Sequence, residues 1–399
     1  MPDPLHGTTV ALGVTGSIAC YKAVDLASKL VQAGANVDVI MTREATNFVT
    51  PLTFGSITHR PVVSDMFEPQ SELGMDHVAV AQRADVVIVA PVTANTLAKI
   101  AWGLSDDALT TTLLATQAPV ILAPAMDAHM FENPATQQNV EKLASWGYFI
   151  VGPAEGRLAS GITGQGRLLE TRELLGHIRA VLGRNGDLAD RKIVVSAGGT
   201  REPIDPVRVI SNRSTGKMGY AVAEAARDRG GDSVLVSTAT SLPDPASVRI
   251  LRVETAEQMR NAVHDECKDA DVLVMAAAVG DWRAASVASL KVKKNGTDSW
   301  SINLTKNPDI LADVQREGLV KVGFAAESEN LVSNAQEKLA SKGLHLIAAN
   351  DITSEDSGFA TDDNRIVLLY REGRVEELPL MPKYEVAHRI LDRVVPLLP

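Results

Sequence analysis

Residues 192–229 read KIVVSAGGTREPIDPVRVISNRSTGKMGYAVAEAARDR, and this stretch decides the fold of the second half of the chain. Its apolar, β-branched run at residues 193–197 is typical of a strand that a doubly wound sheet buries on both faces. The Gly-Gly-Thr sequence at residues 198–200 follows directly, and there the backbone can approach a ligand closely.

A helix is predicted after the proline-rich loop that follows. Ser214 or Thr215 is expected to cap it, and residues 216–229 carry apolar side chains at helical spacing. A strand, a glycine-rich loop and a helix N-terminus together suit an anionic ligand. A Walker A loop is excluded, because Ser211 and Met218 occupy positions where that motif needs Gly and Ser or Thr. The stretch also lacks G-x-G-x-x-G.

Along its whole length the stretch resembles the start of the phosphopantothenate cysteine ligase domain of bacterial coenzyme A synthesis. The signature of that domain reads SAGGTREPxDPVRxISNxSxGKMG. On the residues alone, an ordinary strand-to-helix turn with solvated charges stays open as the alternative.

Composition predicts two domains in a soluble, cytoplasmic protein. The chain has 399 residues, and one domain typically takes about 100–200. Its net charge of −10 argues against non-specific nucleic-acid binding, so local basic residues must meet any phosphate ligand. With only Cys20 and Cys267, a disulfide framework is excluded and a reducing compartment is favoured. The polar N-terminus, MPDPLHG, and the lack of a long apolar run predict neither a signal peptide nor a membrane span.

Strands and helices alternate through the first half. The predicted strands are residues 10–14, 37–41, 86–90 and 120–123. One predicted helix follows Ser17 and ends near residue 33, and three more cover residues 93–102, 108–116 and 134–146. The glycine-rich, charged segment GRNGDLADR at residues 183–191 interrupts the pattern, which then restarts. The predicted fold class is therefore α/β, with two tandem doubly wound, mainly parallel-sheet, Rossmann-like domains at residues 1–188 and 189–399.

A first glycine loop, GVTGSIACYK at residues 13–22, approximates a dinucleotide fingerprint. However, Thr42 stands where a ribose-binding enzyme places Asp or Glu, and a hydroxyl there favours a mononucleotide. Ser17, beside Gly16 at the predicted helix start, could hold a phosphate together with backbone amides. On these residues alone, a tight turn for helix packing is the alternative.

Three further stretches resemble motifs of the homo-oligomeric, flavin-containing cysteine decarboxylases. They are MDHV at residues 75–78 (the His motif), PVTANT at 91–96 (PASANT) and PAMDAHMF at 124–131 (PxMNxxMW). The resemblance covers about residues 10–182, and in the bifunctional family such a domain precedes the ligase. It implies that His77 is the active-site base. It also implies that flavin mononucleotide (FMN) lies against Gly16, Ser17, Thr42, Thr93, Asn95 and Thr96.

In this family the flavin first oxidises the thiol side of the substrate, which lets carbon dioxide leave, and then reduces the resulting enethiol. The implied substrate residues are Met126, Asp127 and His129. Asp127 and Phe131 replace Asn and Trp of the family motif, and Ser160 replaces the reactive Cys of the flap. An ionised Asp127 would repel the substrate carboxylate, although His129 could compensate for its charge, and Ser160 is a far weaker acid than a thiol. The proton donor therefore stays open.

The second half carries more stretches that resemble the nucleotide site of the ligase family, over about residues 193–391. They are AVGDWR from residue 278, KVKK from 291, KNPDI from 306, VGFAAE from 322 and LIAAND from 346. Lys338 and Lys342 are four residues apart and would share one helix face. Such a pair of lysines is either a binding site for a triphosphate or a solvent-exposed cationic stripe. The resemblance implies that CTP is bound by Met275, Ala276, Ala277, Asp281, Lys291, Pro308, Asp309, Ile310, Leu311, Phe324, Lys338 and Lys342.

The ligase resemblance implies that the phosphopantothenate carboxylate attacks the α-phosphorus of CTP, giving an acyl cytidylate and pyrophosphate. The amine of cysteine then displaces CMP. Lys291 is expected to stabilise charge on the phosphates, Mg²⁺ to bridge them, and Asn212 to orient the acyl intermediate. The choice of cytosine rests on the resemblance alone.

Together the resemblances imply two consecutive steps of coenzyme A biosynthesis. L-Cysteine is ligated to 4'-phosphopantothenate at the expense of CTP, and the product is decarboxylated to 4'-phosphopantetheine. The family implies a homo-oligomer, in which trimers of the first domain and dimers of the second build a dodecamer. A pyridine-nucleotide oxidoreductase is a rival reading, disfavoured by the missing G-x-G-x-x-G and acidic ribose residue. The second alternative is a regulatory flavoprotein with an impaired decarboxylase, because Asp127 and Ser160 could signal that the decarboxylase chemistry is lost.

Overall fold

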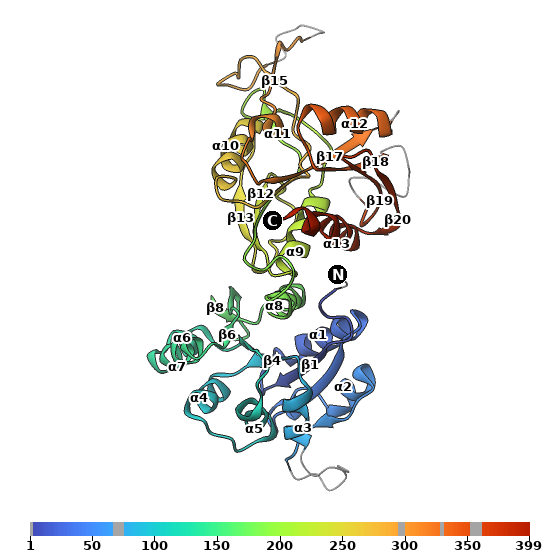
Figure 1. Ribbon diagram of the computed structural model, residues 1–399. Helices are drawn as coiled ribbons and strands as arrows, with labels where there is room; N and C mark the ends of the chain where they lie inside the picture. The colour runs from blue at the N-terminus through green and yellow to red at the C-terminus, as the bar shows by residue number, and fades with distance from the viewer. Residues whose placement is uncertain (1–2, 67–75, 294–299, 328–330, 352–360) are drawn as a thin grey trace. The chain divides into compact units, whose positions relative to one another are not determined.

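The computed structural model describes residues 3–66, 76–293, 300–327, 331–351 and 361–399. The chain divides into two compact units, Asp3–Leu182 and Gly183–Pro399 (Figure 1). The division falls at the first residue of the glycine-rich segment 183–191. Each unit is described by itself below.

The first unit is built on a six-stranded, wholly parallel sheet with the strand order β3-β2-β1-β4-β5-β6. The order reverses between β1 and β4, which is where open α/β sheets bind ligands. The elements are β1 Thr9–Val14, α1 Cys20–Gln32, β2 Asn36–Met41, α2 Pro51–Thr58, β3 Val62–Val63, α3 Asp76–Arg83, β4 Val86–Val92, α4 Ala94–Trp102, α5 Ala108–Ala115, β5 Val120–Pro124, α6 Ala128–Glu132, α7 Pro134–Ser145, β6 Phe149–Ile150, the antiparallel hairpin β7 Ala154–Arg157 and β8 Thr163–Arg167, and α8 Thr171–Gly183.

Helices cover both faces of this sheet. Along β1, Val10, Leu12 and Val14 pack into one core with residues of α1, α2 and α8. Ala11 points to the opposite face and packs into a second core with residues of α3, α4, α5 and α7. Because successive side chains of a strand point to opposite faces, the continuous apolar runs of the sequence fill both cores at once.

The second unit repeats this order in an eight-stranded sheet, β13-β12-β9-β14-β17-β18-β19-β20, and here the reversal lies between β9 and β14. The elements are β9 Lys192–Ala197, the small hairpin β10 Arg201–Pro203 and β11 Val209–Ser211, α9 Lys217–Arg227, β12 Asp232–Ser237, β13 Arg249–Arg252, α10 Ala256–Glu266, β14 Val272–Met275, the hairpin β15 Trp282–Ala284 and β16 Leu304–Lys306, α11 Ile310–Asp313, β17 Val320–Glu327, α12 Leu331–Ser341, β18 Leu346–Asp351, β19 Asp363–Tyr370, β20 Val375–Pro382 and α13 Lys383–Val394.

The predicted fold class, two tandem doubly wound and mainly parallel sheets, is confirmed. The departures are β19 and β20, which pair antiparallel with β18 and with each other at the edge of the second sheet.

The predicted cap of α9 is wrong. The N-cap is Gly216 rather than Ser214 or Thr215, and it carries no side-chain cap. Its φ of 85° is left-handed, and a Cβ at this position would lie 2.9 Å from the Cβ of Ala239. The left-handed backbone and the closeness of the Ala239 methyl group therefore select glycine here, instead of a residue with a capping hydroxyl.

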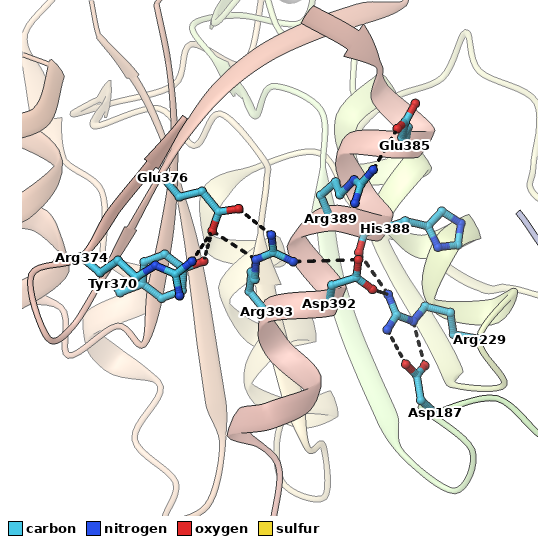
Figure 2. Close-up of polar contacts among 10 residues, drawn as sticks. All are labelled: Asp187, Arg229, Tyr370, Arg374, Glu376, Glu385, His388, Arg389, Asp392 and Arg393. Carbon is cyan, nitrogen blue, oxygen red and sulfur yellow. Dashed lines mark hydrogen bonds and ion pairs between the residues drawn. The ribbon is translucent and has the colours of Figure 1, made fainter. Parts of the chain in front are cut away.

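Arg229 is the largest of the fully buried side chains in the described part of the chain, and it fixes the segment that opens the second unit. Its guanidinium binds both carboxylate oxygens of Asp187, at 2.8 and 2.5 Å, and also Asp392 of α13, at 2.8 Å (Figure 2). It also donates to the carbonyl of His388, at 3.0 Å. One cation thus joins the segment before β9 to the last long helix.

Candidate active sites

The first unit has a cavity of about 500 Å³ at the reversal of its strand order. Gly16 and Ser17 reach it from the loop after β1, Thr93 from the loop after β4, and Met126 from the loop after β5. Ser160 and its neighbours in the β7–β8 hairpin complete the wall. The cavity therefore lies at the carboxyl ends of the central strands.

The buried Thr15 joins two of these loops. Its hydroxyl donates to the carbonyl of Pro91, at 2.9 Å, and accepts from the backbone N–H of Thr93, at 3.0 Å. Thr93 in turn caps α4, because its side chain accepts from the N–H of Thr96. The positions of Ser17 and Thr93 relative to each other are thus fixed by hydrogen bonds within the fold.

Three of the residues expected around the flavin are not in the wall of the cavity. Thr42 is buried and accepts from the N–H of Ala45, at 3.4 Å. Thr96 is buried beside Thr93, with 3.2 Å between the two hydroxyls. Asn95 is exposed on the first turn of α4. In this chain, Thr42 and Thr96 support the loops that Gly16, Ser17 and Thr93 project from.

Asp127 and Ser160, two of the positions that depart from the family motifs, contact each other. The Ser160 hydroxyl donates to Asp127 Oδ2 at 2.7 Å, and both residues line the cavity. This hydrogen bond, together with one from the N–H of His129, holds the pKa of the Asp127 carboxyl below its usual range. His129 Nδ1 lies 3.5 Å from Asp127 Oδ1, with its side chain 83% exposed. An ionised carboxylate therefore faces the cavity.

The β7–β8 hairpin is also held by a backbone hydrogen bond near its open end, opposite the turn. The N–H of Met126 donates to the carbonyl of Gly166 at 3.0 Å, and a Cβ on Gly166 would lie only 2.2 Å from the carbonyl oxygen of Met126. Backbone contact at this distance requires glycine. The hairpin thus meets the residues after β5 at two places, Gly166 and Ser160.

His77 is outside the cavity wall. It is half-buried in the first turn of α3, where its carbonyl accepts from the Thr112 hydroxyl at 3.3 Å. At the other end of α3, Ala84 is followed by Asp85, whose N–H donates to the carbonyl of Thr9 at 2.9 Å. Thr9 is the first residue of β1, so this end of α3 lies at the amino edge of the sheet. His77, at the opposite end of α3, therefore lies toward the carboxyl edge of the sheet, where the cavity is. Met75 of the same motif is outside the described residues.

Lys22 also lines this cavity, although it was not among the site residues predicted from the sequence. Only 6% exposed, it donates to the carbonyl of Leu168 at 2.9 Å and to Glu170 at 3.0 Å. It lies in the third position of α1, just after the glycine loop, so its place on the first turn of the predicted helix could have identified it.

The second unit has a larger cleft, of about 660 Å³, at the corresponding reversal between β9 and β14. All the residues expected to bind the nucleotide line this cleft except Lys291. They are Met275, Ala276, Ala277, Asp281, Pro308, Asp309, Ile310, Leu311, Phe324, Lys338 and Lys342. Residues that are far apart in the sequence are thus brought together at the ends of β14, β16 and β17.

The glycine-rich loop after β9 supports the wall of this cleft. Ala278, in the wall, donates its N–H to the carbonyl of Gly198 at 2.8 Å. Its carbonyl accepts from the Nδ2 of Asn212 at 3.1 Å and from the N–H of Thr200 at 3.3 Å. The side-chain amide of Asn212 is thereby oriented beside the cleft, although Asn212 does not line it.

The two lysines predicted to share a helix face both line the cleft, but α12 ends at Ser341 and Lys342 lies one residue beyond it. The Lys342 N–H still bonds to the carbonyl of Lys338, at 3.1 Å, so the last turn continues. Gly343, with a φ of 61°, then ends the helix in the left-handed conformation. Lys342 Nζ is 3.2 Å from Asp309, which also lines the cleft.

Lys291 lies in an exposed segment apart from the wall of the cleft. The neighbouring Val292 donates its N–H to the buried carboxylate of Asp205 at 3.2 Å, and Ala288 donates to the carbonyl of Ile204 at 3.0 Å. The segment is thus anchored to the β10–β11 region. Lys294 of the same motif is outside the described residues.

The described part of the chain has no helix that is both long and apolar enough to cross a membrane. Within the described ranges, His, Cys, Asp and Glu side chains do not gather in threes that could hold a metal ion.

Family models match both halves of the chain. A model described as the DNA/pantothenate metabolism flavoprotein C-terminal domain matches residues 188–397, and a flavoprotein model matches residues 2–183.

Relatives match nearly the whole length. Coenzyme A biosynthesis bifunctional protein CoaBC of Vibrio vulnificus (strain YJ016) is 42% identical over 98% of this chain and 98% of its own. The CoaBC proteins of Bacillus subtilis (strain 168) and Escherichia coli (strain K12) are 42% and 41% identical over 98% of this chain, and over 98% and 97% of theirs. A crystal structure of the C-terminal domain of a CoaBC protein covers 53% of this chain and 97% of its own, at 36% identity and a TM-score of 0.46. The match of a family model to more than half of the chain, and of relatives to nearly all of it, confirms that the chain belongs to the family of bifunctional coenzyme A biosynthesis proteins.

Proposed function

We propose that this chain catalyses two consecutive steps of coenzyme A biosynthesis. Residues 189–399 would ligate L-cysteine to 4'-phosphopantothenate with CTP, and residues 1–188 would decarboxylate the product with FMN. The observation that carries the proposal is the cleft of the second unit, because residues selected as nucleotide ligands from scattered motifs line one cavity at the reversal of the strand order.

In the ligase half, the substrate carboxylate must first gain a leaving group. Attack on the α-phosphorus of CTP would give an acyl cytidylate and pyrophosphate, and the cysteine amine would then release CMP. Lys338 and Lys342 bring positive charge to the cleft in a chain whose net charge is −10, which suits a triphosphate. Mg²⁺ would enter with the nucleotide and neutralise part of the charge on its phosphates. Asn212, held beside the cleft by Ala278, would orient the acyl carbonyl.

Lys291 is proposed to stabilise the charge that develops as pyrophosphate leaves. Because it lies apart from the cleft wall, its segment would have to approach the phosphates when substrate is bound.

In the decarboxylase half, the cavity fits a flavin mononucleotide. α1 begins without a side-chain cap next to Ser17, so the positive end of its dipole favours a phosphate there, and the Ser17 hydroxyl can donate a hydrogen bond to it. The apolar side chains of Met126, Met130 and Leu168 suit a flat ring. FMN would supply the two-electron oxidation and reduction that removal of carbon dioxide requires.

The chain's own residues would bind the substrate and move its protons. His77 is proposed as the base, and Met126, Asp127 and His129 as substrate contacts. The ionised Asp127 is an unfavourable neighbour for a substrate carboxylate, while the Ser160 hydroxyl satisfies part of its hydrogen-bonding capacity. We further propose a cytoplasmic homo-oligomer, as the family resemblance implies.

The test uses the purified full chain with CTP, Mg²⁺, 4'-phosphopantothenate and cysteine. CMP and carbon dioxide should be released in equal amounts, and the released chromophore should have the mass of FMN. His77→Asn should stop carbon dioxide release and leave CMP release largely intact, whereas Lys338→Gln should weaken both. Absence of substrate-dependent CMP release by the unmodified protein would reject the ligase assignment. Loss of both activities in a folded His77→Asn variant would reject the separation into two sites.

A further inference from the structure

Two lysines at the starts of two helices line the cleft, and neither was among the residues expected to bind the nucleotide. Lys217 is the first residue of α9, and Lys383 is the first residue of α13. Both helices begin without a side-chain cap. The two helices pack against each other in one core that includes Tyr220 and Val386. Two helix N-termini and two ammonium groups therefore converge on one part of the cleft, and all four favour an anion.

Lys383 is buried, with 5% of the residue exposed. Its Nζ donates to the carbonyl of Thr361. Burial, and after it the charge of Lys217, lower the pKa of the Lys383 ammonium to about 8, against the opposing effect of Asp362 and Asp363. Keeping this cation inside the fold therefore costs free energy, which a bound anion would offset.

The surroundings leave space for such an anion. Lys217 Nζ is 2.7 Å from the Asp362 carboxylate, whose side chain is 90% exposed and can turn into solvent without loss of packing. Asn364, only 4% exposed, also lines the cleft and adds a polar side chain. The cleft thus has a cationic pole at Lys217 and Lys383 in addition to the one at Lys338 and Lys342.

We propose that Lys217 and Lys383 form a second phosphate-binding subsite, which takes a terminal phosphate group. This inference rests on the proposed ligase function, in which two phosphorylated substrates, CTP and 4'-phosphopantothenate, enter one cleft. The group bound is either the γ-phosphate of the nucleotide or the phosphomonoester of the acid. In both cases a doubly charged phosphate meets two ammonium groups and the first amides of α9.

The test is titration calorimetry of the full chain and of Lys383→Gln with four ligands: CTP, CDP, 4'-phosphopantothenate and pantothenate. Loss of one charged contact should weaken binding about 10- to 100-fold. If the γ-phosphate is bound, the variant should lose affinity for CTP but not for CDP. If the phosphomonoester is bound, it should lose affinity for 4'-phosphopantothenate but not for pantothenate. Lys268→Gln, an exposed lysine paired with Asp265, is the matched control and should change neither.

Lys217→Gln should shift the same ligand in the same direction, and this variant serves if Lys383→Gln does not fold, because Lys217 is partly exposed. A second measurement separates binding from a structural role. At pH 8 the unmodified protein should take up protons when the phosphate ligand binds, as shown by calorimetry in buffers of different ionisation enthalpy. That uptake should disappear in Lys383→Gln, while Lys217, Asp362 and Asp363 still face the site.

Affinities within about twofold of the unmodified protein for all four ligands, in folded variants of both lysines, would overturn the subsite and leave the proposed function standing. Failure of the unmodified protein to bind either CTP or 4'-phosphopantothenate would instead reject the proposed function and the subsite with it.

Discussion

Arg229→Met tests whether the buried guanidinium holds the second unit together. The Arg229 side chain is 1% exposed, and its ion pairs reach Asp187 and Asp392 on two other segments (Figure 2). Methionine has similar length and no charge, so the variant keeps much of the packing while it leaves both carboxylates without this cation.

The expected loss follows from the geometry. Removing one partner of a buried ion pair costs about 3–5 kcal/mol, because the remaining charge is poorly solvated. The side chains of Asp187 and Asp392 are 32% and 21% exposed, so water can partly solvate them in the variant. We therefore expect a loss near the lower end of this range, about 3 kcal/mol, which corresponds to about 150-fold in the unfolding equilibrium.

Hydrogen exchange measured by mass spectrometry reports this loss within the full chain. Backbone amides of α13 that exchange through unfolding of the unit should exchange about 150-fold faster in Arg229→Met. Arg389→Met is the control in the same helix, because the 3.5 Å pair of Arg389 with Glu385 is about half exposed at both ends (Figure 2). An exposed pair of this kind is worth about 0.5 kcal/mol or less. Equal exchange rates in the two variants would refute the reasoning.

Three further variants test other features. Glu376→Gln should make the stability of the fold depend less on pH in the acid range. Hydrogen bonds, above all from Arg393, lower the Glu376 pKa from 4.5 to about 2. The carboxylate therefore stabilises the fold above pH 4.5, and this contribution is lost as the pH falls toward 2. Between pH 5 and pH 2 the unmodified protein should lose about 3 kcal/mol more than the variant in chemical denaturation. Gly166→Ala should weaken FMN binding at least about tenfold by fluorescence titration, because the new Cβ would push the hairpin away from the Met126 carbonyl. Asn212→Asp should accumulate acyl cytidylate in quenched-flow mass spectrometry, because an added negative charge disfavours the oxyanion formed when cysteine attacks.

Each of these outcomes can fail separately. Parallel acid profiles would show that the Glu376 pKa is not lowered in the folded state. Unchanged FMN affinity in Gly166→Ala would show that the hairpin does not form part of the flavin site. Lys291→Gln should suppress formation of the acyl cytidylate, because it removes the charge that stabilises departing pyrophosphate. If Lys291→Gln accumulates the intermediate and Asn212→Asp does not, the roles proposed for these two residues are reversed.

The parallel strands were predictable from the sequence because buried strands carry unbroken β-branched runs. Residues 193–197 fall within β9, and residues 10–14 fall within β1. The edge strands β19 and β20 were not predicted. Their sequences mix charged and apolar residues, and their pairing depends on contact with β18 rather than on a local signal.

Backbone geometry limited the prediction of helix ends in the same way. A hydroxyl in a sequence identifies a candidate cap, but only the folded chain shows that Gly216 must pass close to Ala239. The motifs anticipated most of the cleft lining because they lie at strand ends, which the parallel sheet brings to one edge. Lys217 lies in the quoted signature but was not among the expected ligands, and Lys383 was missed because it reaches the cleft only through the packing of α13 against α9.

The shared strand order also constrains the sequence of events during synthesis. Val10 of β1 pairs with Val37 on one side and with Val86 on the other, so the central strand keeps one bare edge until β4 has left the ribosome. In the second sheet, one edge of β9 at Ile193 is likewise unpaired until β14, with Val272, has been synthesised. Parallel pairing over such separations is slow, and a bare apolar edge invites aggregation. Because all the strands of the first sheet precede residue 183, that sheet can close before the second begins to form. A nascent chain therefore exposes one unfinished sheet at a time.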